Sequence, residues 1–250
     1  MPAPFVSVRR TWSVPYRFVS YETPASPDAR NLPERSDETS SAVLALLDKA
    51  LSLQAPLVDR HVGRLRRNRP DATPRQILKR LNAEFRAATI GTGAGVGAAA
   101  AAPGVGTAAA LALSGGEALG FMSATALYVL SRAQVHGIPL QDVERRRALV
   151  MAVMLGEAGA KSVEQVAERT GQHWAKTIVK GIPQARINAV NKILGHNFVT
   201  RYGTRQGIIV LGRIIPFGIG AAIGGAANAA FSQGIIKAAD RAFGPAPSDW

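Results

Sequence analysis

Hydrophobic positions recur mainly at three- and four-residue spacing over most of the chain, which is the period of an amphipathic α-helix. The first such pattern follows the N-cap residue Ser36 and runs from Val43 to Leu53. A second begins at Thr73, where the letters Thr-Pro-Arg-Gln have the form of a capping box with proline at the first helical position. Alternating β-branched runs are scarce outside the N-terminal tail. The sequence therefore predicts an all-α helical bundle.

Later helices are predicted by the same pattern and by their stop signals. A run from Thr107 to about Val135 ends at His136-Gly137-Ile138-Pro139, with glycine past the last turn and proline beyond it. Leu140 to Leu155 restarts as a helix with acids in its first turn. Shorter helices are expected over residues 162–170, 173–180 and 184–194.

Two apolar segments, rich in glycine and alanine, interrupt this amphipathic pattern. No charged residue occurs from Ala87 to Gly116, and a second uncharged run extends from Ile215 to Asn228. Small residues one helical turn apart allow two helix backbones to approach closely. The residues predicted to form this helix-packing motif are Gly91, Gly95, Pro216, Gly220, Gly224 and Asn228.

The small-residue segments are long enough for membrane helices but poor in the residues that drive insertion. A spanning helix needs about 20 mostly apolar residues, and leucine, isoleucine, phenylalanine and valine supply most of the favourable free energy. Residues 87–106 contain few of these, and basic residues flank both runs on both sides. The sequence favours membrane-associated helical hairpins or interfacial helices over a single crossing. A soluble bundle with unusually close helix packing remains the alternative.

The composition indicates one folded domain with an anionic partner. The chain has 250 residues, 47% of them hydrophobic, and a formal net charge of +13. We expect an irregular tail and linker over residues 1–35, a helical domain over 36–243 and a C-terminal tail over 244–250. The absence of cysteine fits a reducing cytoplasm.

A basic stretch between Pro56 and Pro70 is the candidate surface for anions. Lipid head groups, nucleic acid phosphates or an acidic protein are all compatible with its charge. Aromatic residues make up only 6% of the chain and are not interleaved with these arginines, so a base-stacking platform is not indicated. The arginines are Arg60, Arg64, Arg66, Arg67 and Arg69.

Candidate chemistry beyond this surface is sparse. Glu117 lies in an apolar helix, where it either faces solvent or is buried against Arg132, Arg213 or Asn228. Asn228 is better placed as a hydrogen-bonding clamp between helices than as a catalyst. The histidines lack the spacing of metal ligands, so a metal site is not indicated. The glycine-rich run at 91–97 follows no predicted strand, so it does not indicate a nucleotide-binding loop. We expect no catalytic residues, metal or cofactor.

The C-terminal apolar run resembles that of the EcsC-like proteins, a family named for a bacterial protein encoded beside an ABC transporter. The resemblance covers roughly residues 41–243 in layout and rests mainly on residues 213–231, while Gly137 and Pro139 match a middle turn more loosely. It implies a membrane-related or transport-associated role without an assigned reaction. The matching residues are Pro216, Gly220, Gly224, Asn228 and Phe231.

The sequence thus predicts a non-enzymatic accessory or scaffold protein, associated peripherally or through hairpins with the cytoplasmic membrane. An anionic membrane surface is the expected partner, and a homo-oligomer is compatible with the small-residue faces. The main alternative is a soluble basic helical protein that binds nucleic acid or an acidic partner. An uncharacterised hydrolase is the third interpretation.

Overall fold

The computed structural model describes residues 32–100, 107–167, 173–212 and 219–250, and side chains over 41–91, 116, 118–166, 173–202 and 228–250. Over the described ranges the chain forms helices and no strand, so the predicted all-α fold class is confirmed.

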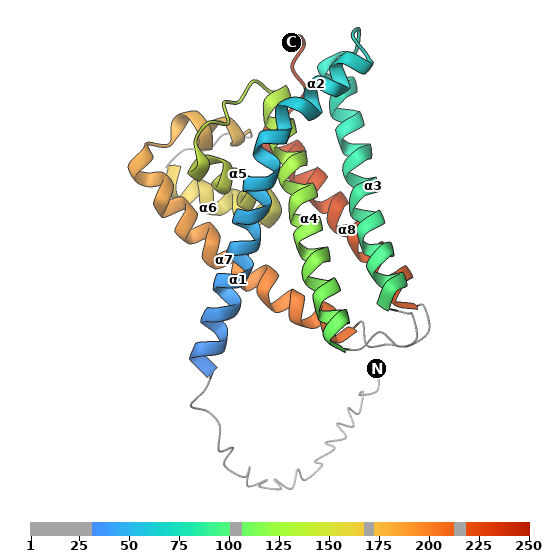
Figure 1. Cartoon of the computed structure of the whole chain (residues 1–250). Helices are drawn as coiled ribbons and strands as arrows, with labels where there is room; N and C mark the ends of the chain where they lie inside the picture. Colours follow the sequence, from blue (N-terminus) through green and yellow to red (C-terminus); the bar gives the residue numbers. More distant parts are fainter. Residues whose placement is uncertain (1–31, 101–106, 168–172, 213–218) are drawn as a thin grey trace, which may run out of the picture.

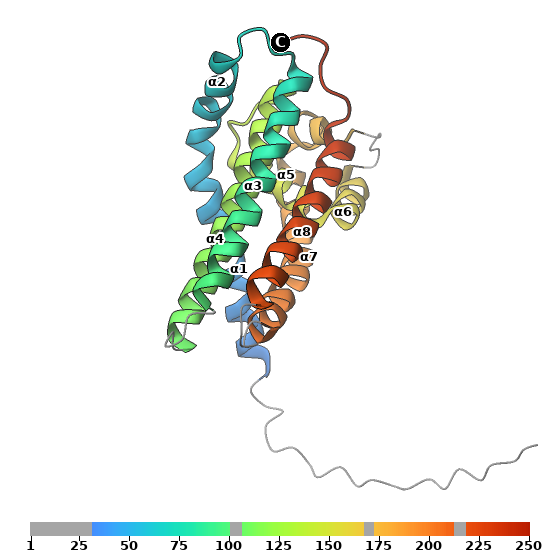
Figure 2. The ribbon, with the colours of Figure 1, turned by 90° about the vertical axis from the view of Figure 1, so that its right-hand side faces the viewer.

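An elongated bundle forms one part of the molecule. α1 continues through the short 3-10 helix η1 into α2, and α1 packs against α4 (Figure 1). α3 lies between α4 and α8 and packs along both (Figure 2). These elements are α1 (Leu32–Gln54), η1 (Ala55–Leu57), α2 (Val58–Asn68), α3 (Pro74–Ala100), α4 (Thr107–Val135) and α8 (Ile219–Phe243).

A second group of helices surrounds α5 (Val143–Leu155), which is the central helix of the fold. α5 contacts α4 and α8 on one side and α6 (Glu157–Ala167), the π-helical turn η2 (Thr177–Gly181) and α7 (Gln184–Gly212) on the other. All residues from Ala148 to Leu155 are buried. A helical segment that is apolar on every side is stable in water only when other helices enclose it, and the second half of α5 occupies this position.

Local signals in the sequence explain several helix ends. Thr73 and Gln76 form the predicted capping box: the Thr73 N–H donates to Gln76 Oε1 at 2.9 Å, and the Gln76 N–H donates to Thr73 Oγ1 at 3.4 Å. α4 has the predicted bounds, and Gly137 takes a φ of 63° just after it. Because an L side chain rarely adopts that φ, glycine stops the helix there.

Other boundaries differ from the predicted ones. α1 begins at Leu32, inside the expected linker, and α5 begins at Val143 because the Asp142 side chain caps the Arg145 N–H. α6 starts at Glu157, five residues earlier than expected, directly after Gly156 with a φ of 65°. The helix expected over residues 173–180 is present as a short helical stretch from residue 175, which ends in the π-helical turn Thr177–Gly181.

Candidate functional site

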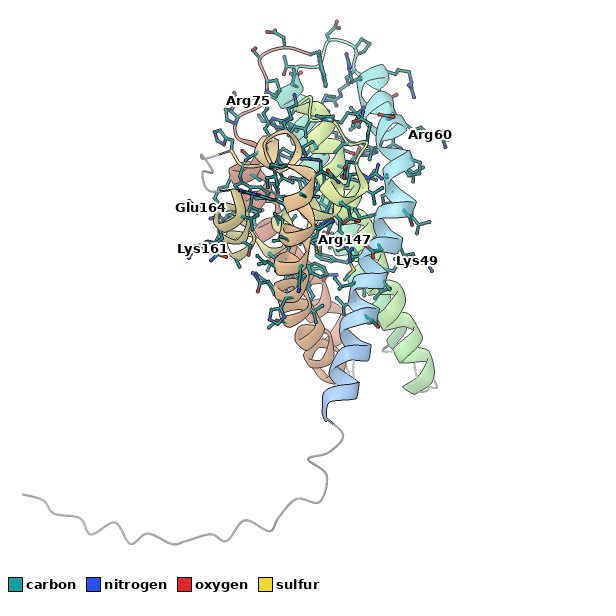
Figure 3. All side chains as sticks on the ribbon, turned by 90° about the vertical axis from the view of Figure 1, so that its left-hand side faces the viewer. Lys49, Arg60, Arg75, Arg147, Lys161 and Glu164 are labelled. Atoms are coloured by element: carbon teal, nitrogen blue, oxygen red, sulfur yellow. The ribbon has the colours of Figure 1, made fainter. Side chains whose placement is uncertain are left out.

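The predicted anion-binding arginines lie on α2 and in the turn that follows it. α2 buries Val58, Val62 and Leu65 against the bundle, so its arginines project from the opposite side. Arg60, Arg64, Arg66, Arg67 and Arg69 are all exposed. Figure 3 places Arg60 at the edge of the molecule, on the opposite side from α6. The structure thus brings the five predicted arginines onto one helix and its end.

These arginines are not equivalent in their contacts. Arg66 stacks over the Trp250 ring, with its guanidinium carbon 4.0 Å from the ring centre. The Trp250 indole N–H donates to the Ala72 carbonyl at 3.0 Å, so the C-terminal residue packs on the turn between α2 and α3. Arg60, by contrast, makes no ion pair among the described side chains.

A carboxylate on α3 joins the two helices at their polar side. Glu84 accepts from Arg80 Nε at 2.9 Å and lies 3.8 Å from Arg64 Nη2 and 3.5 Å from His61 Nε2. Arg64 can only donate, so the His61 Nδ1 atom 3.1 Å away is the acceptor and the ring proton is on Nε2, facing Glu84. Burial lowers the pKa of His61, Glu84 opposes this effect, and Arg64 adds to it. Neutral His61 therefore links the arginine helix to Glu84.

The second predicted feature is the small-residue motif, of which the structure describes the surroundings of two residues, Asn228 and Gly91. Asn228 on α8 donates its side-chain amide to the Thr89 carbonyl on α3 at 3.1 Å, so it does bridge two helices. Gly91 is exposed, and a Cβ atom placed there would meet no heavy atom within 4 Å. Gly91 therefore does not make the close helix contact expected of it.

The remaining motif residues lie at the limit of what the structure describes. Gly95 is on α3, and Gly220 and Gly224 are on α8, two helices that pack together, but their surroundings lie outside the described side chains. Pro216 and the side chain of Glu117 also lie outside the described residues.

A buried polar network was not predicted from the sequence. Arg132 on α4 is 3% exposed and donates to Asp240 Oδ1 on α8 at 2.6 Å and to the Tyr128 hydroxyl at 2.9 Å. Tyr128 in turn donates to Asn82 Oδ1 on α3 at 2.8 Å. The network thus connects α3, α4 and α8. It also includes Arg132, one of the residues considered as a partner for Glu117.

Among the described residues, one helical stretch is long and apolar enough to cross a membrane. It is Ser41–Asn68, with a mean hydropathy of 1.4 over its apolar window. Asp48 and Lys49 lie inside it, and Val43, Leu47 and Ala50 pack into the core. Charged residues disfavour a lipid-facing span, so these positions indicate a helix of the bundle.

The described residues contain no group of three His, Cys, Asp or Glu side chains that could hold a metal ion. Comparisons with protein-family models, curated proteins and solved structures found no match.

Proposed function

We propose that this protein is a membrane-associated, non-enzymatic accessory or scaffold protein of the EcsC-like type, related to transport and located at the cytoplasmic membrane. One observation carries the proposal. Residues 87–100 of α3, 107–116 of α4 and 219–236 of α8 carry no charge, and these parts of the three helices start from one end of the bundle, the uncharged end (Figure 2). The resemblance of residues 213–231 to EcsC-like proteins favours the same interpretation.

The length of this uncharged end suits partial insertion. From Ala87 to Ala100, α3 extends about 20 Å, whereas the hydrocarbon core of a bilayer is about 30 Å thick. Helices satisfy their own backbone hydrogen bonds in lipid. The α3–α4 pair would therefore enter one leaflet as a hairpin without crossing the membrane.

The first turns of α1 limit how far the bundle could enter. They reach the same end of the molecule as the tips of α3 and α4, on the other side of that end (Figure 1), and they contain Glu34, Asp37 and Glu38. Burying such charges in lipid is costly. We therefore assign the insertion to the α3–α4 hairpin and place α1 at the surface.

The arginines of α2 stand at different heights above this hairpin. Arg64 pairs with Glu84, which is about 5 Å along α3 from Ala87. Arg69 lines a hollow with Gln76, about 16 Å from Ala87 along the helix axis and beyond the Debye length of about 8 Å in physiological salt. Arg60 and Arg64 would contact anionic head groups, while Arg66, Arg67 and Arg69 would remain available to an acidic protein or to nucleic acid, which is the second candidate function.

Flotation with liposomes tests the proposal, using Gly91→Lys as the diagnostic variant. Gly91 has open space around it, so a lysine is accommodated and improves helix propensity by up to about 1 kcal/mol. A charge within the hairpin opposes insertion. Ala83→Lys is the matched control, because Ala83 is also exposed on α3 but precedes the uncharged stretch.

We expect the wild type and Ala83→Lys to float with liposomes that contain anionic lipid and to remain bound in 1 M salt, where the Debye length is about 3 Å. Gly91→Lys should be released by that salt. The proposal fails if the wild type does not float, or if both lysine variants behave as the wild type does.

A further inference from the structure

A cavity of about 450 Å³ lies between α2, α3 and α4, at the border of the uncharged end, from which Ala88 contributes to the lining. Its volume falls within the range of about 300–1,000 Å³ that is usual for small-molecule sites. Six apolar residues form most of its lining, and polar side chains from α2, α3 and α4 complete it. The apolar residues are Leu57, Leu81, Phe85, Ala88, Ala124 and Leu127, and the polar ones are Arg60, His61, Arg64, Glu84 and Tyr128.

The inner part of the cavity is rigid and apolar. Phe85 is 3% exposed and stacks on Tyr128, with ring centres 4.5 Å apart. The Tyr128 hydroxyl donates to Asn82 and accepts from Arg132, so Tyr128 is satisfied within the protein. A ligand inside would thus meet ring faces and alkyl groups, which favours a hydrocarbon chain.

The charged lining residues leave an excess of positive charge. Glu84 is shared by Arg64, His61 and Arg80, while Arg60 has no ion-pair partner among the described side chains. His61 is neutral because its Nδ1 accepts from Arg64. Two guanidinium groups against one carboxylate in the lining attract an anion of low charge.

We propose that this cavity binds the anion of a long-chain carboxylic acid. The alkyl chain would lie against Leu81, Phe85 and Leu127, and the carboxylate would pair with Arg60, whose planar guanidinium matches a carboxylate in a two-hydrogen-bond geometry. A neutral lipid would gain nothing from Arg60, and a cationic amphiphile would be repelled. The site shares Arg60 with the head-group contact proposed above, but its apolar lining and its ligand are not part of the α3–α4 hairpin insertion.

Calorimetric titration of the full chain with decanoate, dodecanoate and tetradecanoate, each below its micellar concentration at pH 8, tests the proposal. We expect one ligand per chain and an affinity that rises by about fifteenfold for every two methylene groups, until the cavity is filled. Dodecyltrimethylammonium, with the same chain and the opposite charge, should not bind at the same concentrations. Equal binding of the cationic and anionic compounds, or no dependence on chain length, would overturn the proposal.

Two variants locate the site. Arg60→Gln should weaken dodecanoate binding at least tenfold, whereas Arg75→Gln, an exposed α3 arginine outside the cavity lining, should not. Ala88→Leu should abolish binding, because Ala88 is exposed and a larger side chain there occupies the cavity. Melting temperatures confirm that each variant is folded. Wild-type affinity in both Arg60→Gln and Ala88→Leu would contradict the assignment.

Gly91→Lys separates this proposal from the membrane role. Gly91 is not in the cavity lining, so the variant should lose salt-resistant flotation and still bind dodecanoate with wild-type affinity. Loss of dodecanoate binding in folded Gly91→Lys protein would show that the bound compound sits in the uncharged end and not in the cavity.

Discussion

The side-chain amide of Asn228 on α8 donates a hydrogen bond to the main-chain carbonyl of Thr89 on α3, at 3.1 Å. Asn228→Ala removes this donor and should lower the free energy of unfolding by about 0.5–1.5 kcal/mol. Asn188→Ala, on the exposed side of α7, is the matched control and should change little. Urea unfolding measures both, and equal stabilities would show that the interhelical hydrogen bond contributes nothing.

The buried guanidinium of Arg132 leads to a second prediction. Asp240→Ala leaves this cation, 3% exposed, without its carboxylate partner, and the unmet charge should cost about 1–3 kcal/mol. Asp249→Ala, at the exposed C-terminal tail, should be neutral. In a double-mutant cycle, Arg132→Met should recover part of the loss caused by Asp240→Ala, since no buried charge is left unpaired. Strict additivity of the two losses would contradict this account.

The Thr73–Gln76 capping box and the Arg132–Asp240 pair show which contacts could be predicted from the sequence and which could not. The Thr73–Gln76 capping box joins residues three apart, so its letters alone identified it. The Arg132–Asp240 pair joins residues 108 apart, and nothing local marks Asp240 as its partner. Asn228 was predicted as a clamp between helices, but its acceptor is a main-chain carbonyl, a group that every residue has.

The arginines of α2 and the cavity beside them also differ in how far the sequence predicts them. The arginines from Arg60 to Arg69 are close together in the sequence, so a single helix can carry them, and the structure places them on α2 and at its end. Their distances from the uncharged end depend on how α2 packs in the bundle, mainly against α4, and no local sequence signal determines that packing. The cavity beside Arg60 needs three helices to form, so no sequence motif indicated it.

A third prediction concerns Arg145, whose guanidinium replaces a helix cap. It donates to the carbonyls of Ile178, Val179 and Ile182, each at 2.8 Å, and so satisfies the end of the π-helical turn. Arg145→Gln should destabilise this turn and speed amide hydrogen exchange over residues 177–182. Exchange in this turn that stays as slow as in the wild type would show that the turn holds without the arginine.

A fourth prediction follows from the low pKa of His136. Burial, then Arg132, Lys176 and His173, lower this pKa to about 4, against about 6.5 in an unfolded chain. The folded state therefore binds the proton less readily than the unfolded state. The stability contribution of neutral His136 is complete above about pH 6.5 and is lost as the pH falls toward 4, by the order of 3 kcal/mol.

The variant His136→Phe tests this dependence. A phenyl ring can replace the imidazole beside Phe243, whose ring centre lies 5.3 Å away, and it does not titrate. Urea unfolding between pH 7 and pH 4 should show a smaller loss of stability in His136→Phe than in the wild type. His196→Phe, at an exposed position on α7, serves as the control. A loss of stability in His136→Phe as steep as that of the wild type would assign the acid sensitivity to other groups.

The last prediction compares two glycines in helices. Gly159 on α6 approaches α5 so closely that a Cβ atom there would lie 2.7 Å from the Ala152 Cα. Because backbone cannot move aside as a flexible side chain does, Gly159→Ala should force α5 and α6 apart and cost about 1–3 kcal/mol or more. Gly91→Ala meets no neighbour and should instead raise stability by up to about 1 kcal/mol through helix propensity. Melting temperatures that move in opposite directions would place the close helix contact at Gly159, a position that the glycine spacing did not single out, whereas a fall in Gly91→Ala would show that Gly91 has a packing role after all.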